Sequence, residues 1–406
     1  MADRLLAELI QELPAVLIVG PRASGKTTTA ARHASTVVHL DDPTQAEAFR
    51  ADPDTALSRF AEPVLLDEWQ ATPTVLAAVK RAVDRDFRPG RFIITGSVRA
   101  DLDVDGWPGT GRLVRVRMTG LSERELRGAT EGTPTFLRTI ATSGIEEVAA
   151  PSDPPNLYDY LELAVRGGFP EPALTPSSSA RARLLDGYVD QLITRDLAEL
   201  IGKRDPDRVR TYFEALAVNT AGVVSDKTLH EAAGIDRKTA VSYQGLLRDL
   251  FVFDELPAWN SNRLKRMTRM PKRYITDSGL VAALLGVDAD GILREGDLIG
   301  RLLDTFVVAQ LRAELDVGPR RARLFHLRQE KGAHEVDIVV EFPMNRVVGI
   351  EVKASSAPRR DSGKHLAWLR DQIGDKFIGG IVLHTGPHAY PLADKIIAAP
   401  IAALWA

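Results

Sequence analysis

A glycine-rich loop between a short apolar strand and a helical stretch constrains this chain more than any other feature. Residues 15–28 read AVLIVGPRASGKTT, in which Gly20 is followed by four residues and then by Gly25, Lys26 and Thr27. This spacing fits G-x-x-x-x-G-K-[ST] in its required context, after a strand and before a helix. Glycines let successive backbone N–H groups turn inward around phosphate oxygens, and the helix N-terminus adds a favourable dipole. The loop therefore predicts an ATP site in a parallel α/β domain.

Each residue of this phosphate loop has an expected place around ATP. Lys26 would reach the β- and γ-phosphates, and the Thr27 hydroxyl would ligate Mg²⁺. The residues expected to surround the nucleotide are Gly20, Pro21, Arg22, Ala23, Ser24, Gly25, Lys26, Thr27 and Thr28.

Two acids end the next apolar strand. Residues 63–68 read PVLLDE, which puts Asp67 and Glu68 at the carboxyl edge of a buried parallel strand. Open α/β sheets bind their ligands at that edge. We expect Asp67 to hold Mg²⁺ and Glu68 to orient or deprotonate the attacking water. An isolated acid pair would also fit a helix cap, but a preceding phosphate loop favours the catalytic interpretation.

Composition limits the remaining possibilities. The chain has 406 residues, which indicates two to four domains. Its formal net charge of −3 gives no sign of nucleic-acid binding, so any such surface must be local. It has no cysteine, which excludes disulfides and thiolate zinc sites. With no apolar stretch near the ~20 residues of a membrane span and no signal peptide, we expect a cytoplasmic protein without membrane contact.

Six stretches together resemble a known group of proteins. They are GPRASGKTT, LLDEWQ, FIITGS, GGFPEP at 167–172, MPKRYITDSGL at 270–280, and GIEVKAS. In order and spacing they resemble the AAA-superfamily, STAND-related ATPases of bacteria and archaea that carry a C-terminal domain of unknown function. The chain departs from that pattern at Ala23-Ser24, where bulkier residues are usual, and at Asp304, where Glu is expected.

The resemblance implies further site residues. Ser97 or Thr95, at the end of the strand in residues 91–97, would sense the γ-phosphate, although hydroxyls there also form plain turns. Arg112, or its rival Arg99, would stabilise charge during phosphoryl transfer, within one chain or between copies in a homo-oligomer; either arginine could equally be solvated. Pro170 would lie near the adenine, whereas GGFP alone is only a turn.

The middle of the chain predicts a lid and a reader of DNA. Residues 129–157 read as a long connection, and helical patterns follow through 181–220. Residues 223–256 fit two helices, the second capped by Asp236, and then a hairpin, which is a winged helix-turn-helix pattern. DNA would be contacted by Arg237 and Lys238 and by the basic run in 263–273, chiefly Arg263, Lys265, Arg266 and Arg269. The alternative is a lid or assembly element with a solvated basic edge.

The last part of the chain places charges in apolar segments. The order of elements in residues 300–383, α-β-β-β-α-β, resembles the PD-(D/E)xK nuclease fold. Strand alternation puts Glu351 and Lys353 on one face. Asp337 and Glu351 would then ligate Mg²⁺ or Mn²⁺, Lys353 would position water, and Asp304 could add a helix-borne acid. The alternative is an inert fold whose charges form a buried ion-pair network.

Together these features predict four parts in an α/β chain. They are a P-loop AAA-type parallel-sheet domain (1–128), a linker and helical lid (129–220), a winged helix-turn-helix (221–280) and a nuclease-like α/β domain (281–406). One functional hypothesis is a Mg²⁺-dependent ATPase coupled to DNA binding and to metal-dependent cleavage or remodelling. The other is a nucleotide-controlled switch or interaction protein whose nuclease-like domain is inert.

Overall fold

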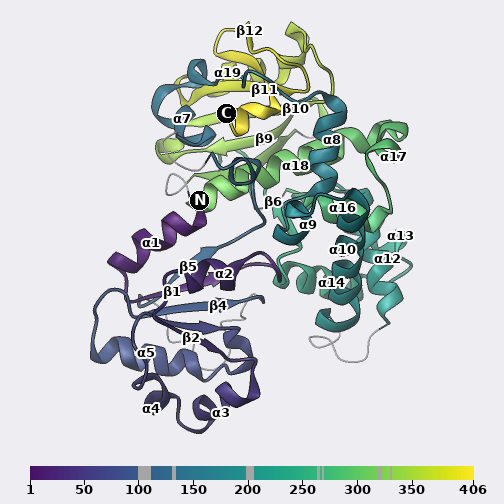
Figure 1. The fold of residues 1–406 in the computed structure, drawn as a ribbon. Coiled ribbons are helices and arrows are strands. Elements are labelled where there is room, and N and C mark those ends of the chain that lie inside the picture. The colour runs from purple at the N-terminus through teal and green to yellow at the C-terminus, as the bar shows by residue number, and fades with distance from the viewer. Residues whose placement is uncertain are drawn as a thin grey trace. The chain divides into compact units, whose positions relative to one another are not determined.

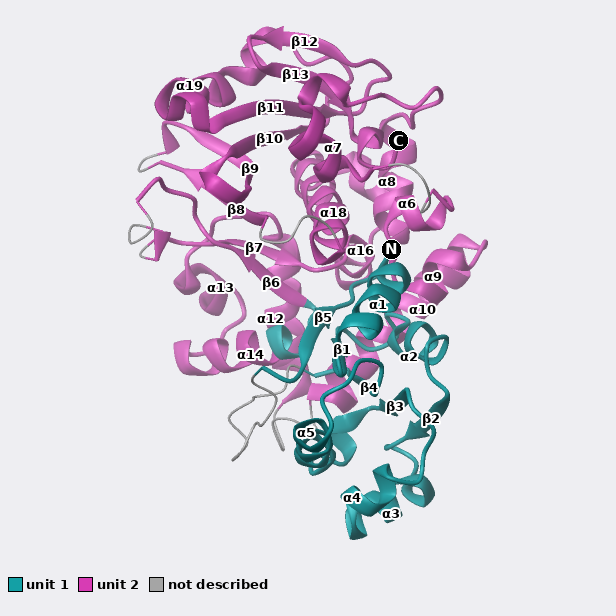
Figure 2. Ribbon diagram, turned by 90° about the vertical axis from the view of Figure 1, so that its left-hand side faces the viewer, with its two compact units in different colours: residues 1–120, 247–252 teal, residues 121–246, 253–406 magenta. Residues whose placement is uncertain are grey.

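The structure is a computed structural model that divides into two compact units. It describes residues 1–98, 111–129, 134–197, 205–262, 266–267, 269–317, 322–329 and 332–406. One unit comprises residues 1–120 and 247–252, and the other comprises residues 121–246 and 253–406 (Figure 2). The predicted lid, hairpin and C-terminal domain therefore lie within one compact unit, and the finer four-part division stays a prediction.

The first unit is built on a parallel sheet. Its strands are β1 (Ala15–Val19), β2 (Thr36–His39), β3 (Val64–Asp67), β4 (Phe92–Gly96) and β5 (Val114–Arg117), in the order β2-β3-β4-β1-β5. All four pairings are parallel, and every residue of β1, β3 and β4 is buried. Parallel strands covered on both faces need continuous apolar runs, which is why these segments lack alternation. The strands expected at residues 15–19, 63–68 and 91–97 are confirmed as β1, β3 and β4.

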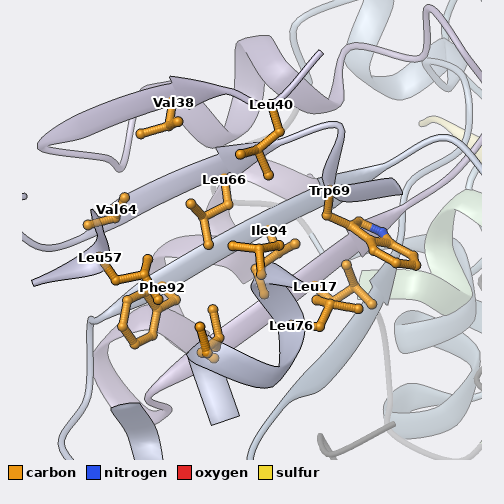
Figure 3. Packing of buried hydrophobic residues seen from close by; sticks show 14 of the residues in the cluster. Leu17, Val38, Leu40, Leu57, Val64, Leu66, Trp69, Leu76, Phe92 and Ile94 are labelled. Carbon is orange, nitrogen blue, oxygen red and sulfur yellow. The ribbon is translucent and has the colours of Figure 1, made fainter. Parts of the chain in front are cut away.

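Helices cover both faces of this sheet (Figure 1). Helices α3 (Pro43–Ala51), α4 (Pro53–Leu57) and α5 (Val75–Arg85) pack on the face that carries Leu17, Leu66 and Ile94 (Figure 3). Helices α1 (Ala2–Glu12) and α2 (Lys26–Ala31) pack on the face that carries Val16, Ile18 and Leu65. A parallel sheet between two helical layers, with a glycine loop after β1, is the architecture of a P-loop ATPase domain.

The second unit begins with helices. They are α6 (Glu123–Leu126), α7 (Phe136–Ser143), α8 (Leu157–Arg166), α9 (Pro170–Leu174), α10 (Ser178–Gln191) with a π-helical continuation (Leu192–Asp196), and α12 (Pro206–Val218). The expectation of a long connection over 129–157 was wrong, because α7 lies inside it. The Glu314 carboxylate accepts the N–H groups of Phe136 and Leu137, at 3.1 and 2.8 Å, and so caps this helix from far along the chain.

Two helices and a hairpin follow, as the sequence predicts. They are α13 (Asp226–Ala232), α14 (Arg237–Asp249), and the antiparallel strands β6 (Phe253–Leu256) and β7 (Lys272–Ile275). Asp236 caps α14 by accepting the Thr239 N–H at 3.0 Å. This order of elements is compatible with a winged helix, which stays a prediction.

The C-terminal part contains a mixed sheet of six strands. After α16 (Ser278–Leu285), α17 (Ala289–Arg294) and α18 (Gly296–Val317) come β8 (Arg323–Arg328), β9 (Glu335–Glu341), β10 (Val347–Lys353), α19 (Lys364–Ile373), β11 (Phe377–His384), β12 (Tyr390–Ala393) and β13 (Ile396–Pro400). The strand order is β12-β13-β11-β10-β9-β8. The predicted α-β-β-β-α-β order is confirmed, whereas its relation to nucleases stays a prediction. Across the described ranges no helix has both the length and the apolar character needed to cross a bilayer.

Candidate nucleotide site

The phosphate loop has a backbone that its glycines make possible. Gly25 adopts φ = 87° immediately before α2, in the left-handed region that glycine enters without steric cost. A Cβ atom on Gly20 would lie 1.9 Å from the carbonyl oxygen of Met118, so no side chain fits there. Both glycines of the motif are therefore required by the fold as well as by the expected ligand.

Lys26 points back onto its own loop. Its ammonium donates to the Pro21 carbonyl oxygen at 2.7 Å, and the side chain is buried. Burial lowers the pKa of Lys26 to about 8, with the positive charge of Arg22 adding to the shift, although Glu68 and Asp67 oppose it. The lysine is thus a buried cation whose nearest acceptor is a neutral carbonyl group.

Thr27 and Asp67 meet at the carboxyl edge of the sheet. The Thr27 hydroxyl donates to Asp67 Oδ1 at 2.8 Å, and Thr95 donates to the same oxygen. His39 Nδ1 lies 3.2 Å from Asp67 Oδ2. Mg²⁺ prefers oxygen ligands, usually one or two from the protein together with phosphates and water. The two residues predicted to hold the ion are therefore adjacent, and their donor atoms suit it.

The backbone and the side chain of Glu68 are held by hydrogen bonds with Thr95, Ser97 and Gln70. Its backbone has φ = 54°, an uncommon conformation for a residue with a side chain, and its N–H donates to the Thr95 hydroxyl at 3.2 Å. Glu68 Oε2 accepts hydrogen bonds from the Ser97 hydroxyl, at 3.0 Å, and from the Gln70 side-chain amide. Gln70 was not among the predicted site residues, although it lies two positions after Glu68.

The other residues predicted to contact the nucleotide or its phosphates are Arg112, Arg99 and Pro170. Arg112 is half-buried and forms an ion pair with Asp84. Its rival Arg99 lies outside the described residues. Pro170 occupies the first position of α9, and the preceding Gly168 N–H donates to the buried Asp277 at 2.8 Å. Asp277 also caps α16, so the GGFP and TDSGL stretches are joined by one carboxylate.

The charges predicted for a second metal site lie together in the C-terminal sheet. Asp337 accepts the Val352 N–H at 3.1 Å, and Lys353 donates to Glu351 Oε2 at 2.8 Å. Burial and the charge of Asp337 raise the pKa of Glu351 to about 8, although Lys353 opposes the shift. The other oxygen of Glu351, Oε1, is buried and has no hydrogen-bond partner among the residues that the structure describes. Three of the predicted residues are therefore close neighbours.

Lys272, which the sequence interpretation placed on an exposed basic edge, completes this cluster. Its ammonium donates to Asp304 Oδ2 and lies 3.1 Å from Asp337 Oδ1, and only 3% of the side chain is exposed. Burial alone would lower the pKa of Lys272, but Asp304 and Asp337 raise it well above its ordinary value. Tyr274 also donates to Asp304, at 3.0 Å. A lysine ammonium thus lies between two of the three acids.

Other basic residues of the run in 263–273 also form ion pairs within the protein. Arg266 forms an ion pair with Glu341 at 2.6 Å, and Arg273 is buried against Asp226. The basic edge expected for residues 263–273 is therefore wrong for Lys272 and Arg273, and the pairing of Arg266 argues against a phosphate contact there. Arg269 is half-buried and donates to the Arg328 carbonyl oxygen at 3.1 Å. Arg263 and Lys265 lie outside the described residues, whereas Arg237 and Lys238 are exposed at the start of α14.

Comparison with known proteins found three family models that match separate parts of the chain. Residues 12–127 match the model of an AAA domain. Residues 157–291 and 299–404 match two domains of unknown function, DUF8612 and DUF4143. The uncharacterized protein Rv2008c of Mycobacterium tuberculosis and the uncharacterized protein Mb2031c of Mycobacterium bovis are each 30% identical over 398 residues, which cover 97% of this chain and 82% of theirs. The chain belongs to the family of these two proteins.

Two solved structures show a more distant likeness. One is the Walker-type ATPase PABY2304 of Pyrococcus abyssi, at 14% identity and a TM-score of 0.39, over 70% of this chain and 94% of that one. The other is the Aeropyrum pernix ORC1 protein in complex with DNA, at 13% identity and a TM-score of 0.25, over 72% and 93%. At these scores no property of either protein carries over to this chain. The family match and the loop geometry identify residues 12–127 as an AAA-type P-loop ATPase domain.

Proposed function

We propose that this domain binds Mg²⁺ and ATP together and hydrolyses the nucleotide. The contact between Thr27 and Asp67 carries the proposal, because it joins a hydroxyl that directly follows Lys26 to a carboxylate at the carboxyl edge of the sheet. The bound ion would neutralise charge that develops on the phosphates. Lys26, whose ammonium donates to the Pro21 carbonyl oxygen, would turn to the β- and γ-phosphates.

Three further residues have roles in this proposal. Glu68 orients and deprotonates the attacking water, and Ser97 senses the γ-phosphate. Arg112, from the same chain or from another copy in a homo-oligomer, is the candidate for stabilising transferred charge, with Arg99 as its rival.

Phosphate release from ATP tests the proposal. Wild-type protein should release phosphate only when Mg²⁺ is present, and Glu68→Gln should slow release by about 10² or more while nucleotide binding persists. The reason is that Gln cannot accept the proton of the water, whereas the ligands of the ion are unchanged. Equal turnover in wild type and Glu68→Gln would remove Glu68 from this role.

For the C-terminal part we propose an inert charge cluster in a nucleotide-controlled, STAND-like switch rather than a nuclease. The position of Lys272 supports this choice, because its ammonium already lies where a cation would join Asp304 and Asp337. The described residues also contain no group of three or more His, Asp or Glu side chains suited to one metal ion. Plasmid and single-stranded DNA incubated with the protein and Mg²⁺ or Mn²⁺, with and without ATP, should stay intact. Cleavage that Asp337→Asn abolishes would instead establish the nuclease hypothesis.

DNA binding is a second candidate activity, and the start of α14 favours it. Arg237 and Lys238 are exposed there, on the second helix of a pair that a hairpin follows. Replacing both with Ala should weaken duplex binding about equally for all sequences and lower the salt dependence, by roughly one unit of slope per lost phosphate contact. The control is Lys227→Ala, an exposed lysine on α13. Wild-type protein without salt-sensitive DNA binding would leave α13 and α14 as an assembly element.

A further inference from the structure

Gln70 closes a hydrogen-bonded triangle with Glu68 and Ser97. It lies in the short helical turn Trp69–Ala71 that follows β3. Its amide nitrogen donates to Glu68 Oε2 and, at 3.0 Å, to the Ser97 hydroxyl oxygen. Ser97 donates in turn to the same oxygen of Glu68 at 3.0 Å. The amide orientation follows from chemistry, because the carbonyl oxygen of Gln70 would repel the carboxylate if the two ends were exchanged.

The triangle gathers both donors on one oxygen of Glu68. The structure gives no hydrogen bond from a described residue to the other oxygen, Oε1, which is therefore open to accept a proton from water. A general base must be within hydrogen-bond reach of that proton, and its orientation decides its efficiency. Holding Oε2 thus fixes the direction in which Oε1 faces.

The side-chain carbonyl oxygen of Gln70 takes no part in this triangle. Among the described residues it has no hydrogen-bond partner although it is buried, and the same is true of the indole nitrogen of Trp69. Both atoms lie beside Gly96. A Cβ atom built on this glycine would lie 2.3 Å from the indole nitrogen and 3.1 Å from the Gln70 oxygen. Gly96 therefore makes room for the close packing of this turn.

We propose that Gln70 is a positioning residue for Glu68 and couples it to Ser97. The inference rests on the proposed ATP hydrolysis. Ser97 has one hydroxyl proton, so a turn toward the γ-phosphate removes its bond to Glu68. Gln70 then holds the carboxylate alone, which makes its role greatest when nucleotide is bound.

Turnover of the full chain with Mg²⁺ and ATP tests this role. Gln70→Ala should lower kcat by about 10–100-fold, since the base loses its orientation, with KM and the affinity for a non-hydrolysable ATP analogue unchanged. In the Glu68→Gln background the same substitution should cause no further loss, because Gln70 acts through Glu68. Gln70→Glu places a second carboxylate beside Glu68, so the acid limb of the rate profile should move to higher pH. The control Gln11→Ala, on an exposed position of α1, should behave as wild type.

Each outcome decides something different. Unchanged kcat in Gln70→Ala, or an equal further loss in the Glu68→Gln background, would overturn the positioning role while leaving ATP hydrolysis intact. Loss of analogue binding together with a lower melting temperature would assign Gln70 to the fold alone. Absence of turnover in wild type would overturn the proposed function and this inference together.

Discussion

Lys26 and Lys272 are both buried lysines near two acids, yet their contacts are opposite. Lys26 donates to a backbone carbonyl, and in the described part of the chain no carboxylate lies within ion-pair distance of it. Lys272 touches Asp304 and Asp337 directly. Accordingly, burial lowers the pKa of Lys26 to about 8, whereas the two carboxylates raise the pKa of Lys272 well above its usual value in spite of burial.

This contrast gives a criterion that separates a binding site from a structural cluster of the same residue types. A buried lysine whose pKa falls lacks a compensating anion in the free protein, and a phosphate group would supply one. A buried lysine whose pKa rises already has its anions. On this criterion the first site is open to an anionic ligand, and the second is already filled by its own cation.

Removing Lys26 should have the largest effect on activity. Lys26→Ala deletes the loop ammonium that is expected to face the phosphates, so phosphate release should fall to the background rate. Lys80→Ala, on the exposed side of α5, is the matched control and should keep wild-type turnover. A steady-state assay at saturating ATP measures the turnover of both variants. Normal turnover of Lys26→Ala would contradict the assignment of Lys26 to a phosphate site.

Removing Lys272 should have the largest effect on stability. Lys272→Met leaves the buried Asp304 and the half-buried Asp337 without this ammonium, which should cost about 3–5 kcal/mol. Lys353→Met is the control, because 38% of the Lys353 side chain is exposed and solvent screens its pair with Glu351. Urea unfolding in EDTA measures the two losses. Equal losses would show that Lys272 is no more structural than its neighbour.

Glu351 gives the comparison a pH dependence. Its pKa is raised from 4.5 to about 8, so between these values the folded protein binds more protons than the unfolded chain. Stability should therefore fall as pH rises through this window. Glu351→Gln should flatten that slope and should not destabilise the protein at pH 8, because Gln resembles the protonated acid. If Mn²⁺ stabilised the wild-type protein and Glu351→Gln abolished that stabilisation, Glu351 would be a metal ligand instead.

The smallest expected effect is the proton uptake that accompanies nucleotide binding. Lys26 has a pKa of about 8 in the free protein, and bound phosphates would raise it. Binding should therefore take up a proton above pH 8, and affinity should decline by up to about tenfold per pH unit there. Calorimetry at pH 9 in buffers of different ionisation enthalpy measures the uptake. If the wild-type protein took up no proton, nucleotide binding would leave the surroundings of Lys26 unchanged.

Each part of the candidate nucleotide site was predictable from a few contiguous residues, whereas the roles of these residues toward ATP stay predictions. The loop, the Asp67–Glu68 pair and the strand ending in Ser97 are each set by a few neighbouring residues, and the contact between Thr27 and Asp67 agrees with their predicted roles. Gln70 was missed since nothing in a glutamine two positions after an acid signals that its amide returns to that acid.

The C-terminal cluster could not be completed from the sequence for a different reason. Lys272 stands in a run of basic residues, which favours a solvated surface, but β7 buries it beside acids that lie 32 and 65 positions away. Helix α7 was missed in the same way, because its cap, Glu314, comes from α18. The order of helices and strands along residues 300–383 was predictable from local patterns, whereas these long-range charge pairings depend on the assembled unit.

Counting bound Mn²⁺ in the full chain compares both sites at once. Electron paramagnetic resonance distinguishes free from bound Mn²⁺ during a titration. With a non-hydrolysable ATP analogue present, we predict one tightly bound Mn²⁺ per chain, lost in Asp67→Asn. Without nucleotide we predict none, because Lys272 occupies the acidic cluster. One tight Mn²⁺ in the absence of nucleotide, abolished by Asp337→Asn and retained in Asp67→Asn, would contradict the assignment of the two sites.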